Sequence, residues 1–397
     1  MKTYLLRGLI SIFLLGLLVG CGQSTAESTA PPPSTVAEPT PPPSSATPIA
    51  ATPSVATLIT PTASNLPQHT SQAEVDQFLN TQVKAEQFSG AVLIARDGAI
   101  LVSQGYGLAD RAQQIANTPQ TKFRLGSLTK PFTALAILQL QAQGKLNVQD
   151  PICQYIADCP AIWQAITIHQ LLTHTAGVPD LTRFPDYEQT KNVASTPAQT
   201  IARFKAKPLD FQPGTKWDYS NSGYILLGAI IEKASGKTYE TFLQENIFTP
   251  LQMVNTGYEH DKALLAIGYA NARDEADLID MSIPFAAGGL YSTVEDLYRW
   301  DQALDTEKLL PKPLWDIMFT AQAAIPNSNG SSYGYGWVLG QQLGHRSVGH
   351  NGGIEGFVTS YNRFPDDKVT IILLSNRQDI NPNQISSELA RIIFAGQ

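Results

Sequence analysis

A serine and a lysine, Ser127 and Lys130, stand three residues apart where a long apolar run begins. Residues 133–143 are mostly Ala, Leu and Ile, and Gly144 follows them, which predicts a buried helix that stops at the glycine. Because residues i and i+3 share a helix face, Lys130 Nζ is expected beside Ser127 Oγ. A lysine in a dry site can act as a base, and a serine at a helix start can offer its backbone N–H to a developing anion. So short a motif also occurs by chance, so the rest of the chain must decide its meaning.

Residues 1–20 have the pattern of a secretory signal, with Lys2 and Arg7 ahead of an apolar core. The core ends at residues 18–21, Leu-Val-Gly-Cys, which resemble the lipobox of bacterial lipoproteins. By that resemblance Cys21 becomes the lipidated first residue of the mature chain. We therefore expect the cell envelope of a bacterium, with the folded body outside the cytoplasm and membrane contact only through the lipid. An ordinary signal peptide, with Cys21 a free or discarded thiol, is the alternative.

Residues 21–70 are dominated by Ser, Thr, Ala and Pro, and no Lys or Arg occurs between Arg7 and Lys84. Such a segment cannot bury enough apolar surface to fold, so it is predicted to be an extended, disordered tether. Residues 71–397 are then expected to form one folded domain.

The charge and the distribution of ligand residues exclude two classes of function. The net charge is −7 and no basic cluster is present, which argues against nucleic-acid binding. The six histidines are scattered, without a His-x-x-x-His or Cys-x-x-Cys pair, so no metal site is expected. In an oxidising compartment Cys153 and Cys159 are expected to form a disulfide, and two buried thiols are the alternative.

The domain reads as a sheet whose strands come from both ends of the sequence. Residues 90–95 and 99–104 are apolar, and Arg96-Asp97-Gly98 between them predicts a hairpin. Further strands are predicted at residues 335–340, 346–349, 356–363 and 368–375. Helices are predicted at residues 72–86, 167–173, 197–204, 224–234, 238–248, 293–304 and 381–394. The expected fold class is therefore α/β (α+β), an antiparallel sheet flanked by helices, with a mainly helical lobe inserted and a site in the cleft between them.

Two further segments carry polar groups suited to chemistry. Tyr219 and Asn221 lie two residues apart just before an apolar helix. His350 lies in the run Gly-His-Asn-Gly-Gly, residues 349–353, at the end of a short predicted strand, where glycines let a substrate backbone come close. Seen alone, Tyr219 could equally be a buried aromatic, and His350 could be a strand-end histidine whose hydrogen bonds are satisfied within the fold.

Taken in order, the three segments resemble the serine hydrolases related to class C β-lactamases. The pattern of that family is Ser-x-x-Lys, Tyr-x-Asn and then Lys-Thr-Gly or His-x-Gly, and it includes D-Ala-D-Ala carboxypeptidases, D-aminopeptidases and some esterases. The segments here are Ser127-Leu128-Thr129-Lys130, Tyr219-Ser220-Asn221 and His350-Asn351-Gly352. Residues 171–177 and 287–293 match as well, so the resemblance covers essentially residues 71–397. It implies a β-lactamase/transpeptidase-like fold and no cofactor or metal.

The resemblance also implies a catalytic role for Ser127, Lys130 and Tyr219. Ser127 would attack a carbonyl and form an acyl-enzyme, which water or another acceptor would cleave. Lys130 and Tyr219 would take the serine proton and pass one to the leaving group, and which of the two is the base stays open.

Three more residues are assigned to substrate binding by the same resemblance. Asn221 would hold Lys130 and the amide of the substrate. His350 would support Tyr219 or meet a substrate carboxylate. The backbone N–H of Gly353, with that of Ser127, would form the oxyanion hole.

The expected partner is a small-molecule or peptide substrate: a peptidoglycan peptide, a D-amino-acid peptide, an ester or a β-lactam. His350 stands where class C β-lactamases have lysine, which favours a D-Ala-D-Ala carboxypeptidase-like or related amide or ester hydrolase. A weak β-lactamase or esterase of the same family and a non-catalytic scaffold lipoprotein are the alternatives. The loops around residues 180–196, 208–215 and 325–332 are expected to set specificity.

Overall fold

The computed structural model describes residues 68–259 and 265–395. The predicted signal segment, Cys21 and the tether up to residue 67 lie outside the described residues. Residues 68–70 were assigned to the tether, but they are helical, because α1 spans Gln68–Lys84. Within the described ranges, no helix is both long enough and apolar enough to cross a membrane.

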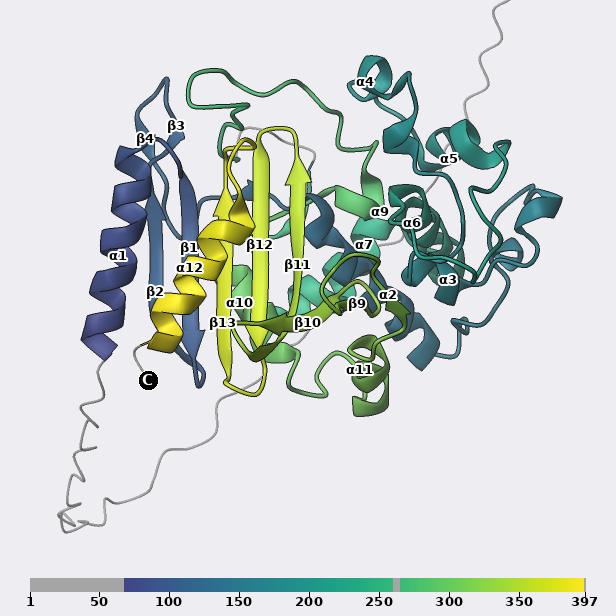
Figure 1. The fold of residues 1–397 in the computed structure, drawn as a ribbon. Coiled ribbons are helices and arrows are strands. Elements are labelled where there is room, and N and C mark those ends of the chain that lie inside the picture. The colour runs from purple at the N-terminus through teal and green to yellow at the C-terminus, as the bar shows by residue number, and fades with distance from the viewer. Residues whose placement is uncertain (1–67, 260–264, 396–397) are drawn as a thin grey trace, which may run out of the picture. The chain divides into compact units, whose positions relative to one another are not determined.

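An eight-stranded antiparallel sheet organises the domain, in the order β2-β1-β13-β12-β11-β10-β9-β8 (Figure 1). Its strands are β1 (Gly90–Arg96), β2 (Ala99–Tyr106), β8 (Ala323–Ala324), β9 (Ser332–Tyr333), β10 (Val338–Gln342), β11 (His345–Ile354), β12 (Phe357–Phe364) and β13 (Val369–Ser375). The first strand pairs with the last, with Ala91 opposite Leu374. The prediction that both ends of the sequence share one antiparallel sheet is therefore confirmed.

The central strands β1 and β13 are buried on both faces of the sheet, because helices cover each face. In β1, Val92 and Ile94 pack in one apolar core with α1 and α12 (Pro382–Ala395), while Ala91 and Leu93 pack in the other. This alternation follows from the two-residue period of a strand. In Figure 1, α1 and α12 lie together on one face, and α10 (Val294–Ala303) lies on the opposite face.

The remaining helices gather beside the sheet, around α2 (Lys130–Ala142) (Figure 1). They are α3 (Ile168–Leu172), α4 (Tyr187–Thr190), α5 (Pro197–Lys205), α6 (Asn221–Ser235), α7 (Tyr239–Leu243), α8 (Thr249–Leu251), α9 (Phe285–Gly288) and α11 (Lys312–Met318). Short strands complete two small sheets, β3 (Leu108–Asp110) with β4 (Ile115–Ala116), and β5 (Phe123–Arg124) with β7 (Leu290–Ser292) and β6 (Gly257–Tyr258). The predicted Cys153–Cys159 disulfide is present, with the two Cα atoms 5.2 Å apart.

Two strand predictions near the site were wrong in extent. Residues 335–337 are not a strand, because Gly336 turns the chain at a φ of +78° where a side chain would press on the Lys130 carbonyl. The strand predicted at 346–349 continues to Ile354 as β11. Residues 349–353 therefore lie inside a strand, paired with β12, and not at its end.

Candidate active site

Ser127 lies on a 3₁₀ turn, Gly126–Thr129, which runs directly into α2. Gly126 starts that turn with a φ of +54°, in the left-handed region that favours glycine. Pro131 lies in the first turn of α2, where its missing N–H costs no helical hydrogen bond. The geometry expected for residues i and i+3 is found, since Lys130 Nζ lies 3.0 Å from Ser127 Oγ.

Lys130 is fully buried and has three polar partners. Besides Ser127, its Nζ donates to Asn221 Oδ1 at 2.8 Å and to the Ala287 carbonyl at 2.8 Å. Burial lowers the pKa of Lys130 to about 7, against a smaller upward effect from the charge of Asp180. A neutral amine has two N–H donors and one lone pair. It can therefore donate to Asn221 and Ala287 and still accept the hydrogen of the serine hydroxyl.

Tyr219 lies in the loop before α6, with its ring beside Lys130 Nζ. Lys130 Nζ is 4.7 Å from the centroid of that ring, and the His174 ring is 4.3 Å from it. His174 also accepts the Ser220 backbone N–H at Nδ1, 3.1 Å away, which fixes the loop. Burial raises the pKa of Tyr219 well above its usual range, although a hydrogen bond with Ser127 opposes the shift. The phenol is therefore protonated at neutral pH.

Asn221 is the first residue of α6, which Ser220 caps by accepting the Gly223 N–H. Its Oδ1 faces Lys130, and its Nδ2 donates to the Asp180 carboxylate at 3.2 Å. The Asn221 backbone N–H also donates to Asp180, at 3.3 Å. Asp180 is 5 % exposed, so a buried carboxylate fixes the orientation of the amide that holds the lysine.

The glycines of β11 serve the packing of the strand against the 3₁₀ turn. A side chain at Gly352 would lie 1.9 Å from the Leu125 carbonyl, and one at Gly126 would lie 2.9 Å from the Gly353 nitrogen. Nothing lies within 4 Å of the place where a side chain at Gly353 would start. Gly353 therefore faces open space next to the turn that carries Ser127.

His350 lies in the same strand but is bound elsewhere. Its Nε2 is 2.9 Å from the Tyr333 hydroxyl and its Nδ1 is 2.6 Å from the Asn351 carbonyl. Burial, and next the charge of Lys130, lower the pKa of His350 to about 3. Its ring is 6.3 Å from that of Tyr219, centroid to centroid. Within the described residues His350 is thus a neutral group whose hydrogen bonds go to the Tyr333 hydroxyl and the Asn351 carbonyl.

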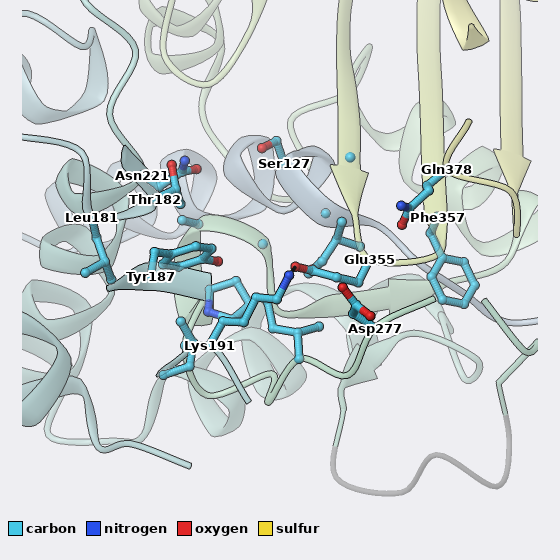
Figure 2. Close-up of a pocket in the computed structure, with 18 of the residues that line it drawn as sticks. Ser127, Leu181, Thr182, Tyr187, Lys191, Asn221, Asp277, Glu355, Phe357 and Gln378 are labelled. Carbon is cyan, nitrogen blue, oxygen red and sulfur yellow. Dashed lines mark ion pairs between the residues drawn. The ribbon is translucent and has the colours of Figure 1, made fainter. Parts of the chain in front are cut away.

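A cavity of about 640 Å³ opens next to Ser127 (Figure 2). Ser127, Asn221 and Gly353 line one end of it, and Figure 2 shows Lys191 and Glu355 meeting at the other. Of the loops expected to set specificity, residues 180–196 contribute to the lining. The described residues of 208–215 and 325–332 contribute none. Residues 277–288 and 354–358 take their place, because α9 and the β11–β12 turn face the serine.

Four residues that contribute to the site were not singled out one by one from the sequence. Asp180 carries a usable signal, because it closes the run 171–180 that brings His174 to the site. Ala287 contributes only its backbone carbonyl, so its side chain gives no signal in the sequence, although residues 287–293 match the family. Glu355 and Lys191 are 164 positions apart and become neighbours only through the fold, with Lys191 Nζ 2.9 Å from Glu355 Oε1.

Most of the chain is similar to proteins of a known family. The family model described as β-lactamase matches residues 75–393. The putative penicillin-binding protein PbpX of Bacillus subtilis is 33% identical over 310 residues, which are 77% of this chain and 74% of the relative.

Two solved structures are also similar. The octameric penicillin-binding protein homologue from Pyrococcus abyssi has a TM-score of 0.73 at 28% identity, covering 81% of this chain and 77% of its own. The D-stereospecific amidohydrolase from a Streptomyces species has a TM-score of 0.68 at 28% identity, covering 80% and 97%. The chain therefore belongs to the β-lactamase family and shares its hydrolase fold.

Proposed function

We propose that the chain is a serine amide or ester hydrolase that works through an acyl-enzyme on Ser127. The observation that carries this is the contact between Ser127 Oγ and a fully buried Lys130 whose pKa is lowered to about 7. Such a lysine is partly neutral at physiological pH, so it can take the serine proton. The D-stereospecific amidohydrolase and the penicillin-binding relatives support substrates of the D-aminoacyl amide, D-alanyl peptide or ester class.

The directions of the two pKa shifts support a division of the proton transfers between Lys130 and Tyr219. Lys130 acts as the base: its lone pair accepts the serine proton while Oγ bonds to the substrate carbonyl carbon. Tyr219 stays a neutral phenol, so it can give its proton to the leaving nitrogen or oxygen and recover one from Lys130. The bond to the leaving group then breaks, and an ester on Ser127 remains. Water attacks that ester with the same groups acting in reverse.

The developing oxyanion is expected between two backbone N–H groups, those of Ser127 and Gly353. The close approach of Gly126 to Gly353 supports this arrangement, because it brings the 3₁₀ turn and β11 together at the open end of the cavity. Removing one donor of such a pair typically costs about 100- to 1,000-fold in rate.

Labelling of the nucleophile tests the proposal. A fluorophosphonate and a fluorescent penicillin are each incubated with the wild type, Ser127→Ala and a matched control, Ser328→Ala. We expect Ser127→Ala alone to lose fluorophosphonate labelling with its circular dichroism unchanged. Equal labelling of Ser127→Ala would refute the nucleophile. A folded wild type that neither reacts nor turns over nitrocefin, a D-Ala-D-Ala peptide, a D-amino-acid amide or a nitrophenyl ester would be a scaffold protein.

We also propose that the chain is exported and anchored at the bacterial envelope through a lipid on Cys21. The residues before Cys21 resemble a lipobox, and the Cys153–Cys159 disulfide is compatible with an oxidising compartment. Metabolic labelling with an alkyne fatty acid should mark the wild type and not Cys21→Ser. Equal labelling of both would refute the anchor and leave the hydrolase proposal untouched.

A further inference from the structure

The cavity beside Ser127 lies on the side that would hold the acyl part of a substrate. This step rests on the proposed function. The leaving group must lie near its proton donor, Tyr219, and Tyr219 does not line the cavity, whereas Ser127, Asn221 and Gly353 do. The part of the substrate that stays on Ser127 therefore extends into the cavity, past Gly353 towards the end of β11.

The cavity has apolar sides and a charged far wall. Ile225, Ile283 and Ile354 are among the residues of the sides. The lining also contains Lys191 and Glu355, and Glu355 lies in the turn that follows β11, two residues after Gly353 (Figure 2). An acyl group of amino-acid size therefore has apolar contacts for its side chain and a polar wall within reach of its other substituent.

The charges around the cavity are unequal. Three carboxylates line it, those of Glu188, Asp277 and Glu355, against the single ammonium of Lys191. Lys191 is bound by Glu188 and, at 2.9 Å, by Glu355. Burial opposes its charge, but the hydrogen bonds and charges of these two partners raise the pKa of Lys191, so it stays protonated. The ion pair to Glu355 uses only Oε1, and Asp277 is exposed with no ion pair among the described residues.

A substrate carboxylate finds no comparable partner. Lys130 is buried and already has three polar partners, and His350 is neutral with both ring nitrogens in hydrogen bonds. Among the described residues lining the cavity, Lys191 is the only cation, and two glutamates already bind it. On the acyl part of a substrate, the cavity therefore favours a positive group over a carboxylate.

We infer that the acyl pocket selects amides or esters of amino acids whose α-amino group is free and positively charged, with Glu355 and Asp277 binding the ammonium. Hydrolysis would then release an amino acid from its amide or ester, as an aminopeptidase-type reaction, and Glu355 would be a specificity-determining residue. Half-buried, with its side chain 16% exposed, the Glu355 carboxylate is screened less than one on the surface.

The test compares leucine p-nitroanilide with its N-acetyl derivative, in both enantiomers, on the full chain. Acetylation removes the positive charge and keeps the scissile bond. We expect the wild type to have a kcat/KM at least about tenfold higher for the free amine, and Glu355→Gln to lose about tenfold on that substrate while its kcat/KM for the acetylated one changes little. Glu307→Gln, an exposed glutamate outside the cavity, is the matched control.

Asp277→Asn gives a second reading if Glu355→Gln does not fold, and it should reduce the preference in the same direction. Equal or higher kcat/KM for the acetylated substrate would overturn the inference. The inference would also be overturned if the protein hydrolysed neither enantiomer of the free-amine anilide while Ser127 still reacted with a fluorophosphonate. In that case Ser127 would remain the nucleophile, and only the inferred substrate class would be refuted. A folded wild type that does not react with a fluorophosphonate would instead refute the proposed function itself.

Discussion

The substitution Asp180→Asn tests whether Lys130 is the base. Asp180 raises the pKa of Lys130 through its negative charge, against the larger effect of burial. Its carboxylate reaches the lysine through Asn221, with hydrogen bonds of 3.2 Å and 2.8 Å on the two sides of the amide. Asparagine has nearly the same shape and can still accept the Asn221 Nδ2 hydrogen. The substitution therefore removes a charge with little change in packing.

The size of the effect follows from the geometry. The two hydrogen bonds and the amide between them put the carboxylate roughly 7 Å from Nζ, where Coulomb's law with an effective dielectric constant of about 20 gives roughly 2 kcal/mol. That energy corresponds to about 1.5 pH units. The base must be deprotonated, so kcat/KM rises with pH through the pKa of Lys130, and its midpoint is expected at about pH 7 in the wild type. In Asp180→Asn the midpoint should fall to roughly pH 5.5.

The assay is a pH profile of kcat/KM on a nitrophenyl ester between pH 4.5 and 9. Asp186→Asn removes an exposed carboxylate that pairs with Arg203, and it serves as the control that should leave the midpoint in place. A lower rate at every pH with an unmoved midpoint would mean that Asp180 only positions Asn221. A midpoint that moved upward would refute Lys130 as the group that titrates.

Two further substitutions test other parts of the site. Tyr219→Phe keeps the ring beside His174 and removes the proton donor, so kcat should fall by about 100- to 10,000-fold while the melting temperature stays close to that of the wild type; a kcat within threefold of wild type would exclude the phenol from proton transfer. Gly126→Ala should lower kcat by about 100-fold, because its Cβ would lie 2.9 Å from the Gly353 nitrogen and push the two oxyanion donors apart. Gly144 has a similar positive φ, and nothing lies within 4 Å of where its side chain would start, so Gly144→Ala should lower stability but not kcat. If Gly126→Ala and Gly144→Ala lowered kcat equally, backbone strain alone would explain the loss.

The sequence predicted those parts of the fold that depend on the pattern of residues within one short segment. The hairpin at residues 96–98 and the antiparallel sheet follow from strand period and turn residues, and the disulfide follows from two nearby cysteines. The spacing of Ser127 and Lys130 predicted their contact, since it depends on one helical turn. The extent of β11 was missed because glycines normally interrupt strands, whereas here Gly352 is required by the Leu125 carbonyl opposite it.

The protonation of Lys130 depends on groups that are far from it in the sequence. Lys130 is buried, and in the proposed mechanism its lone pair points to Ser127 because the Asn221 amide and the Ala287 carbonyl occupy its other two directions. Any residue can supply a backbone carbonyl. The Ala287 carbonyl of α9 therefore binds Lys130 without a side chain that could be recognised in the sequence. Asp180 acts in the opposite sense, since its charge favours the protonated amine while its hydrogen bonds hold Asn221 in place. In a chain with the same Ser-x-x-Lys spacing but an exposed lysine, the lysine would stay protonated at neutral pH, and the serine would have no base beside it.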